Sequence, residues 1–213
     1  MRQFSLLENI LCGIDNALRT VCVPTRRSSL RDTPAHALSD VMMSQEDRRQ
    51  TASLMRVNHS GEVCAQALYQ GQALTAQLTT VKQQMLAAAD DEIDHLAWCE
   101  QRLRELDSQP SVLNVFWYVG SFTMGAVAGL VGDRWSLGFV AETERQVAAH
   151  LQKHLEKIAI TDVKTRTILA VMQEDEAHHA DVATAAGAAT LPFVIKKLMH
   201  AVSFVMTSSS YYI

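Results

Sequence analysis

Two Glu-x-x-His motifs are the residues of this chain best suited to chemistry: Glu92-Ile93-Asp94-His95 and Glu176-Ala177-His178-His179. A lone glutamate precedes each motif, with Glu62 30 residues before Glu92 and Glu144 32 residues before Glu176. Positions i and i+3 share one face of a helix, so each motif can present a carboxylate and an imidazole to the same point. The spacing of about thirty residues corresponds to one helix, a short turn and half of the next helix. Two antiparallel helix pairs would therefore bring four carboxylates and two imidazoles together in one core.

Such a core needs metal ions. Four buried carboxylates would repel one another and would be costly to remove from water, whereas two divalent cations cancel their charge. Carboxylate oxygen combined with neutral imidazole nitrogen suits iron or manganese, while a thiolate-rich site would indicate zinc or an iron–sulfur cluster. The pattern is that of the ferritin-like di-iron and di-manganese carboxylate bundles. Because such a site leaves open coordination positions, it is suited to dioxygen chemistry.

Two positions in the pattern have competitors. His178 and His179 are adjacent and only one can point inward; His179 is three residues after Glu176, so His178 is expected to face outward or to support a ligand. Glu142 competes with Glu144, but Glu144 gives the step to Glu176 that is closer to the 30 residues of the first half. We therefore take Glu144 as the ligand and Glu142 as a surface or supporting residue. His59 and His150 are candidates for orienting a ligand carboxylate or moving a proton, with an ordinary helix histidine as the equal alternative. Tyr69 could reach the core, although packing is its expected role.

Length and composition indicate one mostly helical protein. The chain has 213 residues, enough for one domain, with only four prolines and nine glycines. A net charge of −4, with no long basic block, argues against a nucleic-acid partner. Its four cysteines form no C-x-x-C pair and are expected to be reduced core residues. The first residues lack the apolar core of a secretion signal.

The predicted elements follow from apolar periodicity and turn residues. An amphipathic helix over 4–21 and a solvated polar linker over 24–34, with a small basic cluster, form an N-terminal segment, 1–45. The ligand-bearing domain, 46–213, contains four long helices. They are expected over 44–76, 80–106, 134–158 and 161–186, with Thr161 or Asp162 as the cap of the last and Gly187 at its end. Gly61, a poor helix former, is expected to let a backbone or a ligand come close.

Two further segments could meet a membrane. Residues 111–132 have no charged side chain but contain polar residues and four glycines, so we expect a buried or interfacial helix rather than a span. Residues 193–206 combine an apolar face with Lys196, Lys197 and His200. That helix could pack on the bundle or lie on an anionic membrane surface, and the sequence does not choose.

The chain resembles the demethoxyubiquinone hydroxylase family over about residues 50–207. The similarity is carried by Arg56-Val57-Asn58-His59-Ser60-Gly61-Glu62 with Tyr69-Gln70-Gly71-Gln72, Asp91-Glu92-Ile93-Asp94-His95-Leu96, the glycine-rich segment 119–132, Glu144 with His150, and Glu176-Ala177-His178-His179-Ala180-Asp181. The stretch 1–45 is similar to the extension of bacterial members.

The resemblance implies an all-α, ferritin-like four-helix bundle with additional membrane-contacting helices. It implies two iron ions held by six ligands: Glu62, Glu92, His95, Glu144, Glu176 and His179. Of these, Glu92 and Glu176 are the ones expected to bridge both ions. It also implies an O2-dependent monooxygenase that hydroxylates 2-polyprenyl-3-methyl-6-methoxy-1,4-benzoquinone in ubiquinone biosynthesis. The expected location is peripheral, on the cytoplasmic side of the cell membrane.

No dinucleotide-binding fingerprint is present, so an external two-electron donor, NADH or quinol-linked, is expected. Other ubiquinone-biosynthesis proteins and further copies of the chain are possible partners. The alternative function is that of another ferritin-like di-metal protein: a manganese catalase, a rubrerythrin-like peroxidase or an iron-binding non-enzyme.

Overall fold

The computed structural model describes residues 6–22, 27 and 29–213, and within these ranges helices are the only regular secondary structure. The helices are α1 (Leu6–Val21), α2 (Gln45–Thr75), α3 (Thr79–Glu105), α4 (Asn114–Val131), α5 (Asp133–Lys157), α6 (Val163–Ala185) and α7 (Phe193–Ser210). The all-α class is confirmed, and the helix bounds agree with the sequence prediction to within a few residues.

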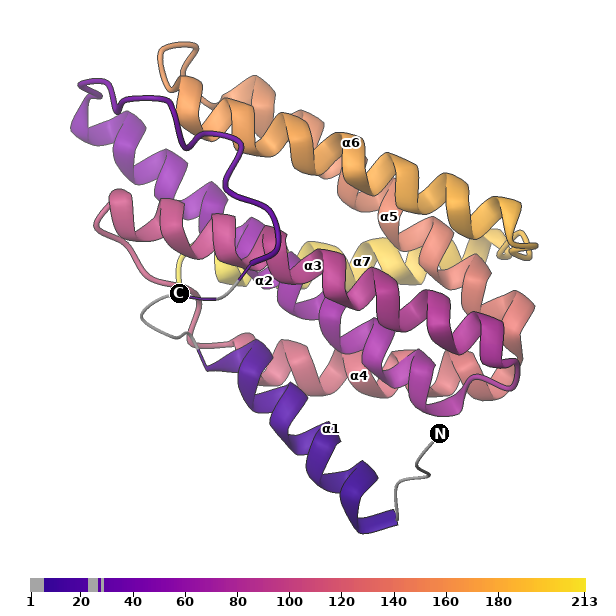
Figure 1. Ribbon diagram of the computed structural model, residues 1–213. Helices are drawn as coiled ribbons and strands as arrows, with labels where there is room; N and C mark the ends of the chain where they lie inside the picture. Colours follow the sequence, from indigo (N-terminus) through magenta and orange to yellow (C-terminus); the bar gives the residue numbers. More distant parts are fainter. Residues whose placement is uncertain (1–5, 23–26, 28) are drawn as a thin grey trace.

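Two helical hairpins form the bundle. Helix α2 packs on α3, and α5 packs on α6, while the two pairs meet through α2 with α5 and α3 with α6 (Figure 1). The remaining helices surround this bundle: α4 packs along α2 and also contacts α5, α7 contacts α2 and α5, and α1 contacts α2 and α4. This is the predicted ferritin-like architecture with additional helices.

Local signals set the ends of the long helices. The hydroxyl of Ser44 accepts the backbone N–H of Asp47 at 3.0 Å at the start of α2. Asp162 rather than Thr161 caps α6, because its carboxylate accepts the N–H of Thr165 at 3.1 Å. Just beyond α6, Gly187 has a φ of +99°, a backbone conformation that favours glycine.

The polar ligand candidates lie between two apolar clusters. On each bundle helix, residues of one cluster come before the candidate and residues of the other come after it. The first cluster contains Leu54, Met55, Trp98, Leu103, Leu151, Leu169 and Met172, and the second contains Ala65, Tyr69, Met85, Leu137, Val140 and Ala183. Burial of both clusters therefore fixes the helix rotations that turn the polar layer inward.

Glycines bring α4 unusually close to α2. A Cβ added at Gly71 would collide with the backbone carbonyl of Phe122, and one added at Gly125 would collide with the carbonyl of Leu68. Gly61 differs, since an added Cβ there would meet no atom within 4 Å. The apolar segment therefore packs one glycine-containing face against the bundle.

The expectation of a solvated linker over 24–34 is confirmed for residues 29–32, which are exposed, but is wrong for Arg27. The side chain of Arg27 is only 7% exposed and lies 2.6 Å from the buried carboxylate of Glu100. Arg31 pairs with Asp94 on α3 at 3.0 Å. These buried acids attract the arginines, which sequence periodicity does not reveal. Arg26 and Ser28 lie outside the described residues, and the division into 1–45 and 46–213 stays a prediction.

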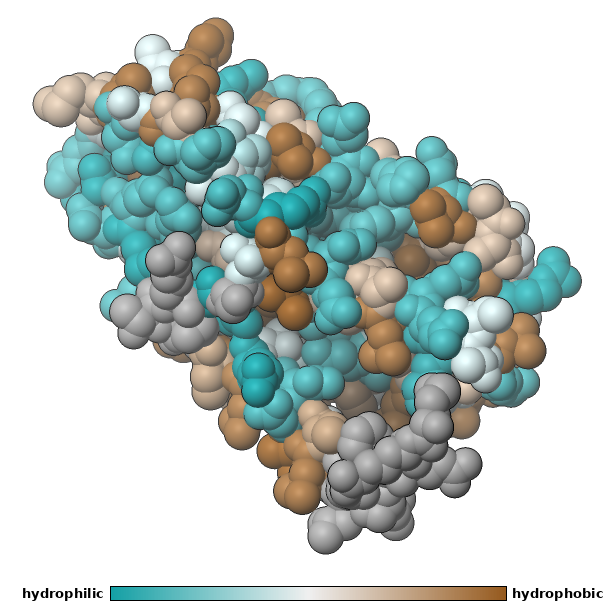
Figure 2. Space-filling model, viewed as in Figure 1, coloured by the Kyte–Doolittle hydropathy of each residue, from teal (hydrophilic) through white to brown (hydrophobic). Residues whose placement is uncertain are grey.

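Helices α4 and α7 each leave an apolar face uncovered. Within the described residues, α4 alone is long and apolar enough to span a membrane, and a third of it is buried. On α7, Lys196 does not remain free, since it pairs with Glu142 of α5 at 2.8 Å. The face of the molecule shown in Figure 2 is mainly hydrophilic, with hydrophobic residues gathered along its lower edge over α1.

Candidate metal centre

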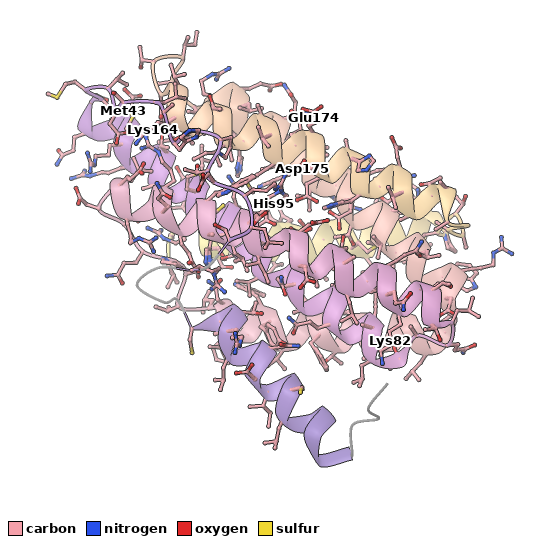
Figure 3. All side chains as sticks on the ribbon, viewed as in Figure 1. Met43, Lys82, His95, Lys164, Glu174 and Asp175 are labelled. Atoms are coloured by element: carbon pink, nitrogen blue, oxygen red, sulfur yellow. The ribbon has the colours of Figure 1, made fainter. Side chains whose placement is uncertain are left out.

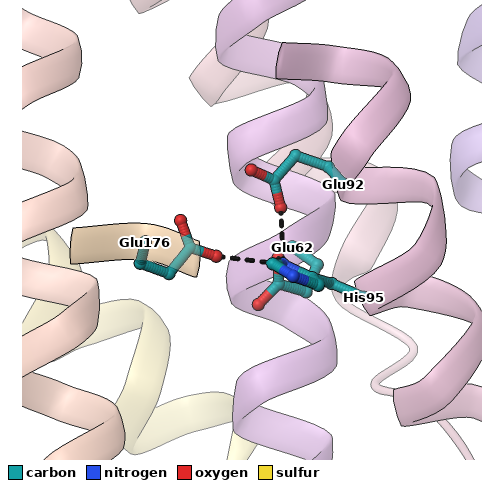
Figure 4. Close-up of side chains that lie close together, drawn as sticks. All are labelled: Glu62, Glu92, His95 and Glu176. Carbon is teal, nitrogen blue, oxygen red and sulfur yellow. Dashed lines mark hydrogen bonds and ion pairs between the residues drawn. The ribbon is translucent and has the colours of Figure 1, made fainter. Parts of the chain in front are cut away.

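Four of the six predicted ligands converge in the middle of the bundle. Each offers one ligand atom, and these atoms lie within 4.8 Å of one another: Glu62 from α2, Glu92 and His95 from α3, and Glu176 from α6 (Figure 4). None of the four is more than 2% exposed. The structure thus brings together residues separated by up to 114 positions in the chain.

His95 points into this cluster with one ring nitrogen. Its Nδ1 atom lies 3.0 Å from Glu176 Oε1, 3.2 Å from Glu92 Oε2 and 3.5 Å from Glu62 Oε2. An imidazole nitrogen surrounded by three carboxylates is a donor set for a divalent cation.

The other two predicted ligands border the cluster. Glu144 on α5 is fully buried, and its Oε1 accepts a hydrogen bond from the hydroxyl of Tyr69. His179 on α6 places Nδ1 3.5 Å from both Glu92 and Glu176. Tyr69 is therefore more than the packing residue expected from the sequence, because its hydroxyl fixes a carboxylate of this layer.

The competing residues face elsewhere. His178 is exposed, and Glu142 binds Lys196 on α7. His59 is buried between Glu100 and Asn114, at 3.4 and 3.1 Å, and none of its hydrogen bonds goes to a predicted ligand. His150 lies in the wall of a small cavity beside Glu62, and its Nε2 has no hydrogen-bond partner.

Sequence reasoning missed two aspartates and an arginine. Asp175 Oδ2 lies 3.0 Å from His95 Nε2, and Figure 3 shows the two side chains beside each other between α6 and α3. Asp91 Oδ2 lies 3.5 Å from His179 Nε2. Arg31 pairs with Asp175 at 2.9 Å. The available signal was that an aspartate directly precedes the glutamate of each Glu-x-x-His motif.

Burial and mutual repulsion govern the electrostatics of the glutamates. Burial and the charge of Glu92 raise the pKa of Glu62 well above its usual range, and burial with the charge of Glu176 does the same for Glu144. Burial alone would also raise the pKa of Glu92 and of Glu176. The imidazoles of His179 and His95, which lie 3.0–3.5 Å from these carboxylates, outweigh burial for these two and lower both pKa values.

The histidines respond in the opposite sense. Burial disfavours their charged forms, but the carboxylates around each imidazole outweigh it. Asp175 and Glu176 raise the pKa of His95 well above the usual range, and Glu176 and Glu92 raise the pKa of His179 to about 10. The raised pKa values of the two imidazoles and of two glutamates thus favour protonated forms that offset the negative charge of the layer.

Unsatisfied atoms show that the residues fit metal ions. Among the buried atoms without a hydrogen-bond partner are Glu92 Oε1, Glu144 Oε2, both carboxylate oxygens of Glu176 and His179 Nδ1. Orphaned polar atoms are rare in protein interiors, so their concentration at one point needs a cause. Divalent cations would satisfy these atoms as ligands.

A four-helix bundle with four buried glutamates, one buried histidine and a second, partly buried histidine in one layer defines the class of ferritin-like di-metal carboxylate proteins. Within that class, residues 49–210 match the model of the family described as "Ubiquinone biosynthesis protein COQ7". The chain belongs to this family, the demethoxyubiquinone hydroxylases, which confirms the resemblance seen in its motifs.

Bacterial relatives match along the whole chain. A Legionella pneumophila (strain Paris) protein is 59% identical over 213 residues, covering 100% of both chains. A protein of Acinetobacter baylyi is 52% identical, with 100% of both chains covered. A protein of Nitrosococcus oceani is 51% identical, with 100% of this chain and 99% of its own covered. Each relative is named 3-demethoxyubiquinol 3-hydroxylase. The chain is therefore an enzyme of the hydroxylase type rather than a storage or structural bundle.

Proposed function

We propose that this chain is an O2-dependent di-iron monooxygenase that hydroxylates the ring of demethoxyubiquinone, 2-polyprenyl-3-methyl-6-methoxy-1,4-benzoquinone, or of its quinol, in ubiquinone biosynthesis. The observation that carries the proposal is an apolar cavity of about 340 Å³ beside the glutamate layer. The names of the relatives specify the quinol as the form hydroxylated in those proteins.

The cavity has the position that a quinone substrate requires. It lies among α2, α4, α5 and α7, and its wall includes Gly61 and Thr143, the direct neighbours of Glu62 and Glu144. A smaller cavity of about 40 Å³ has Glu62 in its own wall and shares Gly61 with the larger one. The missing side chain at Gly61 thus keeps open the way from the cavity to the glutamates.

A second apolar groove suits the polyprenyl tail. It has a volume of about 420 Å³ between α4 and α7 and shares Met124, Phe139 and Met199 with the first cavity. Its continuity with the exposed faces of both helices would let the tail remain in lipid while the ring lies in the protein.

The six ligands would hold two iron ions. Glu92 Oε2 faces His95 and Glu92 Oε1 faces His179, and the two oxygens of Glu176 divide between the histidines in the same way. This supports Glu92 and Glu176 as the bridging ligands. Glu62 with His95 would complete one iron site, and Glu144 with His179 the other. When bound, the iron pair supplies the oxidising power for dioxygen activation.

The reaction requires an external reductant. One oxygen atom of O2 enters the ring C–H bond, and the other leaves as water with two protons and two electrons. NADH or a quinol-linked donor would provide the electrons. The protein binds and orients the quinone, excludes water with its apolar walls and holds Glu144 in place through Tyr69.

Membrane association would give access to the substrate. The exposed apolar side chains of α4 and α7, with Lys197 available for anionic lipid headgroups, support peripheral contact with a membrane, and the cytoplasmic side of the cell membrane is the proposed location. Other enzymes of ubiquinone biosynthesis and further copies of the chain are proposed partners there.

Quinone profiling tests the function. In cells lacking this protein, a wild-type copy should clear the accumulated demethoxy quinone, while Glu176→Ala should not and should bind less iron. Glu174→Ala is the matched control, since Glu174 is exposed on the same helix two residues away and points outward in Figure 3. A normal ubiquinone profile in the deletion strain, or clearance by Glu176→Ala at two irons per chain, would contradict the proposal.

A further inference from the structure

The aspartate that precedes each Glu-x-x-His motif contacts the histidine of the other motif. Asp175, which precedes Glu176, contacts His95 of the first motif, and Asp91, which precedes Glu92, contacts His179 of the second. Each imidazole therefore directs Nδ1 toward the glutamates and Nε2 toward an aspartate of the other half. Such a carboxylate fixes the tautomer and the ring orientation of a metal-ligating histidine.

The two contacts differ in strength. Asp175 Oδ2 lies 3.0 Å from His95 Nε2, and the aspartate side chain is 24% exposed. Asp91 Oδ2 lies 3.5 Å from His179 Nε2, and its side chain is 56% exposed. Among the described residues, Asp175 also has an arginine partner, Arg31, whereas Asp91 has no ion pair with a lysine or arginine.

Arg31 is held firmly where it meets Asp175. Its Nη2 donates to Asp175 Oδ2 at 2.9 Å, and its Nε donates to Asp94 Oδ2 at 3.0 Å. The guanidinium lies 4.8 Å from the centroid of the Trp98 ring, and the indole N–H of Trp98 donates to the Arg31 carbonyl at 3.3 Å. The guanidinium of Arg31 thus connects Asp94 on α3 with Asp175 on α6 from outside the bundle.

We propose that Asp175, held by Arg31, is a positioning residue that fixes His95 for metal binding. The metal site on the His95 side consequently binds more tightly than the one on the His179 side. Arg31 precedes residue 49, where the match to the family model begins, so the N-terminal segment contributes to the centre from outside that match. The inference rests on the proposed metal centre and deepens it.

Fe(II) binding to the metal-free, full-length protein tests the proposal under anaerobic conditions. Competition with a chromogenic chelator should resolve a tight and a weaker site in the wild type. Asp175→Asn should weaken the tight site by about 10–100-fold, the usual loss when a partner of a metal-bound histidine is removed. Arg31→Gln should weaken the same site by a factor nearer the lower end of that range, and Arg31→Lys should restore part of the loss. Asp91→Asn should lower the Fe(II) affinity of the weaker site, by a smaller factor than Asp175→Asn lowers that of the tight site.

Arg27→Gln is the matched control. It removes another arginine of the N-terminal segment, whose partner Glu100 does not contact His95. We expect a lower melting temperature for this variant but unchanged Fe(II) affinity. Equal losses of affinity in Arg27→Gln and Arg31→Gln, or wild-type affinity in Asp175→Asn, would overturn the proposal while leaving the proposed function intact. Wild-type protein that binds no Fe(II) would overturn the proposed centre itself.

Discussion

Each histidine of the centre contacts carboxylates from both halves of the chain. His95 lies against Glu62 and Glu92 from the first half and Glu176 and Asp175 from the second. His179 likewise touches carboxylates of both halves. Neither helical hairpin can therefore assemble a complete environment for its own imidazole, and the centre requires the docked bundle.

Metal binding should depend steeply on pH. Glu62 and Glu144 have raised pKa values and favour their neutral forms, while His95 and His179 have raised pKa values and favour their charged forms. All four groups must lose protons to act as ligands, so metal uptake should release protons. Apparent affinity should consequently rise with pH through neutrality, up to the pKa of His179 at about 10. Fe(II) titrations at several pH values measure this slope, and an affinity independent of pH would contradict it.

At the scale of elements, the packing of α4 on α2 decides the shape of the proposed substrate cavity. Because Gly71 and Gly125 lack side chains, the two backbones approach closely, and α4 forms one wall of the cavity. A larger residue at either position would have to push the helices apart, since the atoms it meets are backbone carbonyls.

Gly125→Ala should lower stability by about 1–3 kcal/mol, the usual cost of overpacking a tight interface. Gly120→Ala is the matched control on the same helix, because an added Cβ there meets nothing within 4 Å. It should be neutral or stabilising by up to about 1 kcal/mol, the helix preference of alanine over glycine. Urea unfolding of both variants compares them, and equal effects would show that the glycine contact does not limit packing.

The helices and the six ligand candidates were predictable because they depend on local spacing. Glu92 and His95 share a helix face by geometry alone, and Asp162 and Gly187 mark a helix start and end through their own chemistry. By contrast, the contact of Arg31 with Asp175 spans 144 positions of the sequence, and the contact of Tyr69 with Glu144 spans 75. No periodicity encodes such pairs, since they form only when helices dock. For the same reason, the burial of Arg27 contradicted the expectation of a solvated loop.

At the scale of the whole molecule, polar and apolar surfaces are segregated. The metal layer is enclosed by two apolar clusters, whereas α4 and α7 keep apolar faces that nothing in the described chain covers. Exposed patches of this kind mark interaction sites rather than random surface. Both helices line the cavity and the groove, so under the proposed function a quinone would enter from the patch without crossing water.

The membrane-facing role of α4 can be tested without altering the cavity. Val119 and Leu130 are 59% and 68% exposed, lie on one face of the helix and do not line either cavity. The double variant Val119→Glu/Leu130→Glu should lose at least about tenfold in binding to phosphatidylglycerol-containing vesicles, since each lost apolar contact is worth about 1.5–3 kcal/mol. Vesicle sedimentation measures the effect. Thr80→Glu/Gln83→Glu adds the same charges to exposed positions on α3 and should sediment as the wild type does. If both double variants sediment equally with the vesicles, α4 does not provide the membrane contact, and the quinone must reach the cavity by another face.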